Sequence, residues 1–199
     1  MGDLMILQTG KVYFGGRLYL TPVQESDGMA VTLWRNSPSA RAAFFNRNVV
    51  TPDSHAAWLR AKPPHDCVWM ARDKDGGKLV GMAGLLVDPA AHIAEAGRFF
   101  VAPEFRSGGY GLEIDWTVLA YAFDVLQLEK VWIDAFQSNA PIIKMHGKAG
   151  YAVVGVDMHN HTHPRGPVVH MEMIRMEWYN LVRQRFIEAR GVTLPDPLA

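Results

Sequence analysis

The sequence predicts one mixed α/β domain, with a mixed central sheet of about seven strands flanked by helices. Two observations carry this prediction. Short runs that alternate apolar and polar residues are interleaved with longer runs of helical periodicity. In addition, 49% of the 199 residues are hydrophobic, which suits one domain with a substantial core. We expect the domain to span residues 17–190, with a leader over 1–16 and a frayed tail over 191–199.

The front of the predicted domain is a strand followed by helices. Arg17–Val23 alternates apolar and polar residues, as a half-buried strand does. Helix-start and helix-stop residues then delimit the helical segments. These are Met29–Arg35, a short piece that reaches Asn46, and a helix that begins at Pro52 after the cap Thr51 and stops before Pro63.

Three strands follow, and the first two form a hairpin. Asp73–Lys78 contains the Asp and Gly residues of a tight turn between Cys67–Arg72 and Leu79–Val87. A further strand, Ala94–Val101, comes after the next turn. Cys67 is the only cysteine, so an internal disulfide is excluded, and its apolar strand indicates a core residue rather than a nucleophile.

The back of the domain begins with a long helix, Leu112–Leu128, whose apolar residues recur at helical spacing from Ile114 to Leu126. The later elements are a strand Lys130–Phe136, a helix Pro141–Lys148 ending at Gly150, strands Tyr151–Met158 and Val168–Trp178, and a helix Asn180–Arg190. The long last strand and the amphipathic last helix are expected to serve a homodimer.

Charge and hydropathy exclude several classes of function. Lysine and arginine balance aspartate and glutamate, so the formal net charge is zero with neutral histidines. A nucleic-acid binder that relies on bulk positive charge is therefore not expected. We find no apolar run that would span a bilayer and no secretory leader pattern, so we expect a cytoplasmic protein without a membrane partner.

The most informative stretch joins the strand that ends at Val101 to the helix that follows. It reads Arg106-Ser107-Gly108-Gly109-Tyr110-Gly111, an Arg-x-x-Gly-x-Gly turn. Helix N-termini present unpaired N–H groups that bind anions, and glycines let those groups approach closely. The pattern is neither a P-loop nor a full dinucleotide fingerprint. By itself it fits an anion site or a plain tight turn.

A second motif resolves this ambiguity. The stretch Asn139 to Tyr151 contains a short helix and ends in Lys-Ala-Gly-Tyr. In this order and setting, the two motifs resemble those of the GNAT N-acetyltransferase superfamily over roughly Arg17 to Trp178. The resemblance implies the GNAT fold, a sheet splayed at an acetyl-CoA site, and acetyl-CoA as co-substrate without a metal.

The resemblance also assigns residues to the donor. Pantetheine would lie between the strand ending at Val101 and Lys130–Phe136, bonded to their free backbone groups and to Asn139. The turn would bind the pyrophosphate. The implied cofactor-binding residues are Val101, Arg106, Ser107, Gly108, Gly109, Tyr110, Gly111 and Asn139.

The reaction implied is direct attack of a primary amine on the thioester. The departing thiolate needs a proton, and where relatives commonly have a tyrosine this chain has His146. His146 could be that acid, or it could only pack beside the cofactor. Glu95 is the candidate base, with a solvated strand-edge residue as its alternative. His55, His92 or a chain of waters are the other options.

The acceptor site is expected in the front helices, which combine aromatic and polar side chains. They resemble the branch that acetylates the 4-amino group of nucleotide-linked deoxyamino sugars in the pseudaminic acid pathway. They also resemble the ribosomal-protein N-terminal acetyltransferase (RimJ/RimL-like) branch. Arg35 could grip a diphosphate and the aromatic rings could stack on a base, or these residues could belong to the core. The candidate substrate-binding residues are Trp34, Arg35, Asn36, His55 and Trp58.

Three further possibilities remain at the level of sequence. The loop His159–Pro167 holds alternate histidines, yet no cysteine or carboxylate completes a metal set, so we expect a solvated tip or a cover over the acceptor. A non-catalytic acyl-CoA-binding module is the rival class, because His146 replaces the usual tyrosine. A nucleotide-binding fold of another type is the third option.

Overall fold

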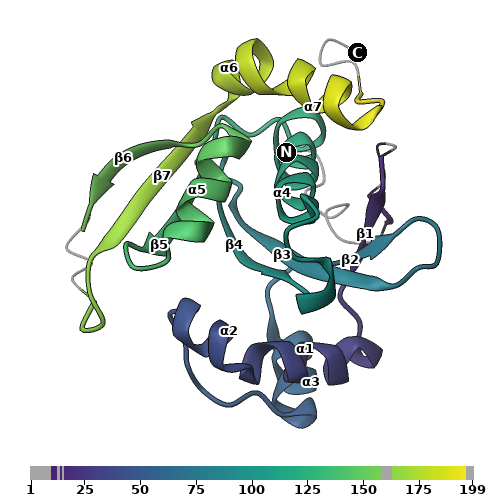
Figure 1. The fold of residues 1–199 in the computed structure, drawn as a ribbon, viewed down its shortest axis with the longest axis vertical. Helices are drawn as coiled ribbons and strands as arrows, with labels where there is room; N and C mark the ends of the chain where they lie inside the picture. The colour runs from purple at the N-terminus through teal and green to yellow at the C-terminus, as the bar shows by residue number, and fades with distance from the viewer. Residues whose placement is uncertain (1–9, 13, 15, 158–162, 196–199) are drawn as a thin grey trace.

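A seven-stranded mixed sheet with the order β1-β2-β3-β4-β5-β7-β6 forms the centre of the computed structural model (Figure 1). The structure describes residues 10–12, 14, 16–157 and 163–195. Every strand pair is antiparallel except β4 with β5. The strands are β1 Leu18–Pro22, β2 Asp66–Asp73, β3 Leu79–Asp88, β4 Ile93–Val101, β5 Lys130–Phe136, β6 Ala152–Val156 and β7 Val168–Ile174.

Helices cover both faces of the sheet, with α1–α3 on one side and α4, α5 and the C-terminal helix on the other (Figure 1). The helices of the front are η2 Glu25–Asp27, α1 Gly28–Asn36, α2 Pro38–Ala43 and α3 Pro52–Ala61. Those of the back are η3 Pro103–Phe105, α4 Tyr110–Ala120 with the π-helical turn η4 Tyr121–Val125, α5 Ala140–Ala149, and α6 Arg175–Glu177, η6 Trp178–Val182 and α7 Arg183–Arg190.

Strand β2 shows why the sheet is apolar on both faces. Cys67, Trp69 and Ala71 point into the larger core, which lies under α4. Val68 and Met70 point into a smaller core under α1 and α2. Because neighbouring side chains of a strand face opposite ways, a strand buried on both sides is a continuous apolar run. We call the α4 side the donor face and the α1–α3 side the acceptor face.

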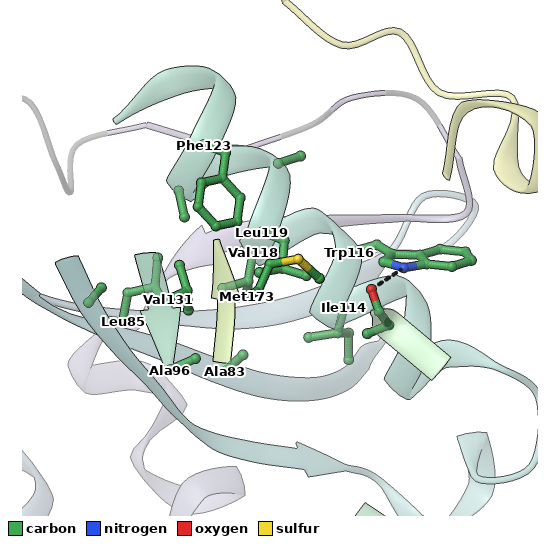
Figure 2. Close-up of a cluster of buried hydrophobic side chains, with 14 of the residues drawn as sticks. Ala83, Leu85, Ala96, Ile114, Trp116, Val118, Leu119, Phe123, Val131 and Met173 are labelled. Carbon is green, nitrogen blue, oxygen red and sulfur yellow. Dashed lines mark hydrogen bonds between the residues drawn. The ribbon is translucent and has the colours of Figure 1, made fainter. Parts of the chain in front are cut away.

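The larger core is built around α4, where every residue from Glu113 to Ala120 is buried. Figure 2 shows Leu119 and Phe123 above the sheet, close to Met173 of β7. The Trp116 indole donates a hydrogen bond of 3.2 Å to the carbonyl oxygen of Ala149 at the end of α5. The long predicted helix is therefore correct in place, although it begins at Tyr110 and its last turn is π-helical.

Strands β4 and β5 confirm the predicted splay. They pair only from Ile93 to Glu95 with Lys130 to Trp132, and we find no further pairing between them along their described lengths. On its other side β4 pairs with β3 up to Val101, and β5 pairs with β7 to its end. A bulge inserts one extra residue in β4 opposite Ala83, and Arg98 there has a φ of 56°. A bulge bends its strand, so β4 turns away from β5.

Two sequence predictions were wrong near the C-terminus. The last strand ends at Ile174 rather than Trp178, because Trp178, Val182 and Phe186 are buried at helical spacing in one continuous helical stretch. The tail is not frayed over its described part. Val192 is buried, and the amide of Thr193 donates to the carbonyl of Phe14.

Strand β6 lies at one edge of the sheet, with β1 at the other, and exposes valines on both of its faces, namely Val153, Val154 and Val156. An exposed apolar edge favours pairing with another chain. The homodimer stays a prediction that this edge supports. In the described part of the chain, no helix is long and apolar enough to cross a membrane.

Gly150 is a position where the fold requires glycine, since it closes α5 with a φ of 112°. A Cβ atom there would lie 2.5 Å from Val182 Cγ2 and 2.6 Å from Met173 Cε. We predict that Gly150→Ala lowers the free energy of unfolding by about 2–4 kcal/mol, through backbone strain and overpacking.

Urea unfolding measures this effect, and Gly147→Ala on the same helix is the matched control. A Cβ at Gly147 would meet nothing within 4 Å, so that variant should be about 0.5–1 kcal/mol more stable than the parent. Equal effects of the two variants would contradict the prediction.

Candidate active site

The glycine turn has the geometry of an anion site. Ser107 and Gly109 both adopt left-handed backbone angles, with φ of 64° and 76°, and Gly109 caps α4. Within the described residues we find no hydrogen bond from the amides of residues 107–112. Unpaired amides at a helix N-terminus attract an anion through both their hydrogens and the helix dipole.

Gly111 lets α4 approach its neighbours closely. A Cβ atom there would lie 2.7 Å from Met145 Sδ on α5 and 3.3 Å from Val101 Cγ2 on β4. The turn therefore lies where the end of β4, the start of α4 and the flank of α5 meet. This junction is one end of the gap between β4 and β5. A pyrophosphate on the turn would place its pantetheine arm at that gap.

Arg106 does not reach toward the turn in this structure. Its Nε donates to the carbonyl oxygen of Val101 at 3.1 Å, and its guanidinium lies 5.4 Å from the ring centre of Phe100. Its assignment as a pyrophosphate ligand stays a prediction. A different arginine contacts the turn: Arg17 Nη1 donates to the Gly108 carbonyl oxygen at 3.1 Å.

Asn139 lies at the N-terminus of α5 and beyond the open end of β5, and its assignment to pantetheine stays a prediction. Its amide donates to the Phe136 carbonyl, and its carbonyl accepts from the amides of Ile142 and Ile143. Its half-buried side-chain amide forms no hydrogen bond within the described residues. The side chain is thus available to a ligand in the gap.

His146 is fully buried on the donor face and is held by a carboxylate that sequence reasoning missed. Its Nδ1 lies 2.6 Å from Oδ2 of Asp115 on α4, and both side chains have no exposed surface. The Nε2 atom has no partner within the described residues. The ring packs edge-on against Phe99, with 4.9 Å between centres, and Phe99 belongs to the splayed half of β4.

We call the hydrogen-bonded pair of His146 and Asp115 the dyad. Its buried surroundings shift the pKa values of Asp115 and of the adjacent Tyr151. Burial raises the pKa of the Asp115 carboxyl, an effect that the charge and hydrogen bond of His146 oppose. Burial, together with the nearby Asp115, raises the pKa of the Tyr151 hydroxyl well above its ordinary value. The dyad therefore lies in a dry, low-dielectric site. The sequence signal for Asp115 was an acid in the middle of an otherwise apolar helix.

A polar network on the acceptor face was also missed from sequence. His170 on β7 lies between two carboxylates, with Nδ1 2.6 Å from Asp134 Oδ1 and Nε2 3.2 Å from Glu172 Oε1. Lys130 Nζ donates to the same Glu172 oxygen at 2.8 Å. Because both ring nitrogens face carboxylates, the geometry suits an imidazolium. The signal was alternate polar residues on two apolar strands.

The positive charges of this network favour the ionised form of Glu172. Burial opposes the charge of Glu172, but hydrogen bonds from Lys130 and His170 and their positive charges lower the pKa of Glu172 overall. Asp134 is two residues past the last β4–β5 pair, and Glu95 belongs to that pair. Strand alternation puts Glu95 and Asp134 on the acceptor face, opposite Ala94, Ala96 and Ile133 of the larger core.

Several of the predicted acceptor residues pack within the front helices. Trp34 is buried and stacks on Phe100 at 5.2 Å. The Arg35 guanidinium lies 3.8 Å from the Phe44 ring centre, and Arg35 Nη2 donates to the Asn46 carbonyl oxygen. Burial lowers the pKa of Arg35. Trp34 also lines a shallow hollow of about 580 Å³ with Lys78, Leu79, Glu104 and Phe105.

The remaining candidates of this region are held in a similar way. Asn36 forms two hydrogen bonds with the backbone of Val50, at 2.7 and 2.9 Å. His55 is buried, and its ring lies 5.5 Å from that of Trp58. The exposed His92 lies in the turn between β3 and β4, at the end of β4 remote from the gap. No direct role in acceptor binding is visible for these residues, and their assignment stays a prediction.

The β6–β7 loop closes against the front helices at its described end. Arg165 donates to the backbone carbonyl oxygens of Ala42, Phe44 and Phe45. The rings of Phe45, Phe136 and His163 form a cluster there. The loop thus covers one side of the acceptor face. Residues 159–162 of the histidine loop lie outside the described residues, and we find no group of three potential metal ligands in the part described.

A family model described as an acetyltransferase (GNAT) domain matches residues 17–152. The chain belongs to this family. Its co-substrate is acetyl-CoA, and the fully buried Cys67 agrees with transfer that uses no cysteine nucleophile. The match leaves the branch within the family open.

Solved structures confirm the fold. A spermidine N-acetyltransferase from Vibrio cholerae in complex with CoA and spermine has a TM-score of 0.73 at 17% identity, covering 82% of this chain and 99% of that chain. A GCN5-related N-acetyltransferase from Brucella melitensis has a TM-score of 0.74 at 19% identity, covering 91% of this chain and 86% of that chain. A putative acetyltransferase from T. thermophilus has a TM-score of 0.74 at 18% identity, covering 95% of this chain and 99% of that chain.

Proposed function

We propose that the chain transfers the acetyl group of acetyl-CoA to a small primary amine by direct attack, with the amine approaching from the acceptor face. The observation that carries this proposal is the gap where β4 and β5 part. The free amides of residues 107–112 lie at one end of the gap. A buried acid–base pair lies on its donor face, and carboxylates lie on its acceptor face.

His146 is the proposed acid for the departing thiolate. With Asp115 as a carboxylate, the imidazolium donates one N–H to Asp115 and keeps the Nε2–H for another acceptor. The pair is neutral overall, so it can be buried at a tolerable cost. The amine nitrogen would bond to the thioester carbon, and collapse of that adduct would break the C–S bond while the Nε2 proton goes to the departing thiolate. No acyl-enzyme intermediate is then needed, and the ring would be reprotonated from solvent after each turnover.

Glu95 and Asp134 are the proposed partners of the acceptor's ammonium group. They extend from neighbouring strands onto one face, at the point where the gap opens. Two carboxylates attract a cation, and either one can accept the proton that the amine must lose before attack. His170 restrains Asp134 through the bond to Nδ1, which leaves the second carboxylate oxygen of Asp134 for the amine.

The carboxylates favour a small cationic amine as acceptor. The Vibrio cholerae neighbour was solved with spermine, which is such an amine. The nucleotide-sugar acceptor has less support, because the Arg35 guanidinium that would bind a diphosphate already stacks on Phe44 and bonds Asn46. The pseudaminic-pathway branch and the ribosomal-protein branch remain the alternatives.

An acceptor panel tests the proposal directly. We expect thiol release from acetyl-CoA with polyamines or other small diamines, and weaker release with UDP- or dTDP-linked amino sugars and N-terminal peptides. Activity confined to peptides or nucleotide sugars would replace the proposed acceptor. CoA binding without turnover on every amine would favour the non-catalytic module.

The role of His146 predicts a split between the kinetic constants. His146→Phe should lower kcat by about 100-fold or more and leave the KM for acetyl-CoA nearly unchanged. His65→Gln, in the turn before β2, is the matched control and should retain full activity. Since loss of His146 leaves Asp115 buried without a partner, Asp115→Leu/His146→Phe is made in parallel to keep the fold. A folded variant whose kcat stays within threefold of the parent would remove His146 from the chemistry.

The carboxylates predict a pH-dependent defect. Glu95→Gln and Asp134→Asn should each lower kcat/KM for the amine by about tenfold or more at neutral pH. The defect should shrink toward pH 10, because an alkylamine then loses its proton without help. Asp75→Asn in the β2–β3 turn is the control. A defect of the same size at every pH would indicate lost packing instead of lost proton transfer.

A further inference from the structure

Glu113, in the first turn of α4, is a buried carboxylate that joins both ends of the domain. It accepts hydrogen bonds from the backbone amide and Nε of Arg17, each at 2.8 Å. Its Oε2 lies 2.7 Å from Arg17 Nη2 and 3.0 Å from Arg190 Nε of α7. Glu113 has almost no exposed surface, while both arginines are partly exposed.

This cluster lies directly behind the glycine turn. Arg17 Nη1 donates to the Gly108 carbonyl oxygen at 3.1 Å. A Cβ atom at Gly109 would lie 3.3 Å from Arg190 Nη2 and 3.7 Å from Arg17 Nη2. Because a trans peptide points its C=O and N–H in opposite directions, a bond to the Gly108 carbonyl turns the Gly109 N–H away from Arg17. That amide then faces the side from which an anion can approach.

The charges of the cluster also favour an anion at the glycine turn. Two guanidinium groups surround one carboxylate, which leaves an excess positive charge behind the turn. The Arg17 guanidinium also lies 4.2 Å from the ring centre of Tyr110, the first residue of α4, so its position is fixed by packing as well. Arg106 meanwhile bonds the end of β4.

We propose that Arg17, held by Glu113 and flanked by Arg190, is a positioning residue for the pyrophosphate of CoA. It fixes the Gly108–Gly109 peptide and adds positive charge without contacting the ligand. The proposal rests on acetyl-CoA as the donor and is independent of the acceptor.

Calorimetric titration of the full chain with CoA tests the proposal. Arg17→Gln should weaken CoA binding on the order of tenfold, the effect of losing one charge-assisted hydrogen bond. Arg60→Gln, which breaks an exposed ion pair with Glu25 on the front helices, is the matched control and should change the affinity less than threefold. Arg17→Gln/Glu113→Gln removes the buried charge together with its partner, and it should show the same CoA defect without an unpaired carboxylate.

Pantetheine, which lacks the pyrophosphate, separates positioning from general damage. Its binding should be the same in the Arg17→Gln variant and the parent. In ¹⁵N-glycine spectra, the Gly109 amide should shift when CoA binds to the parent and shift less in the variant. Unchanged CoA affinity, or equal weakening of CoA and pantetheine, would overturn the proposal.

The outcomes also separate this inference from the proposed function. If the parent chain binds CoA with the predicted Arg17 dependence but acetylates no amine, the positioning role stands and the proposed acceptor chemistry fails. If the parent chain does not bind CoA, both the donor and the role of Arg17 are refuted.

Discussion

The separation of β4 from β5 is the constraint on which the rest of the site depends. The two strands share only three residue pairs, and each is then held by its other neighbour. The bulge at Arg98 supplies the cause, because an extra residue in β4 bends that strand while β5 stays aligned with β7. The open strands keep unpaired backbone groups inside a sheet, a cost that a bound ligand removes. The bulge also places Phe99 on the donor face, against His146.

Helix α4 and its π-helical turn connect the ends of the chain to this gap through three buried acids. Glu113 binds Arg17 and Arg190, and Asp115 binds His146. Asp124 accepts hydrogen bonds from the Trp178 indole and from Arg183. A buried carboxylate is costly alone, and losing its partner typically costs about 3–5 kcal/mol. The three acids therefore specify the neighbours of this helix: Glu113 the N-terminal segment and α7, Asp115 the helix α5, and Asp124 the C-terminal helical stretch. An apolar surface alone would specify these contacts less sharply.

The sequence allowed the fold class, most elements and the glycine turn to be predicted, because they depend on local pattern. Alternation identified β1, and the cap Thr51 with Pro52 identified α3 within a residue. The features that the sequence did not predict depend on contacts between residues that are distant along the chain. The partner of His146 is 31 positions away, and the clamp behind the turn joins residues 17, 113 and 190. Trp178 suits a strand by propensity, yet it is helical because Val182 and Phe186 share its buried stripe.

In the proposed function, the donor face of the sheet serves acetyl-CoA and the acceptor face serves the amine. On the donor face, the larger core lies beside the His146–Asp115 pair, and neither side chain of the pair has any exposed surface. On the acceptor face, the core is smaller, and hydrogen bonds from Asn36 and Arg165 tie loops to it. In these hydrogen bonds the acceptor is a backbone carbonyl, which any residue supplies. The side chains of the accepting residues are therefore weakly constrained. Under the proposed function, changes in the α1–α3 region or the β6–β7 loop can therefore alter the acceptor while α4, the glycine turn and the His146–Asp115 pair keep their contacts.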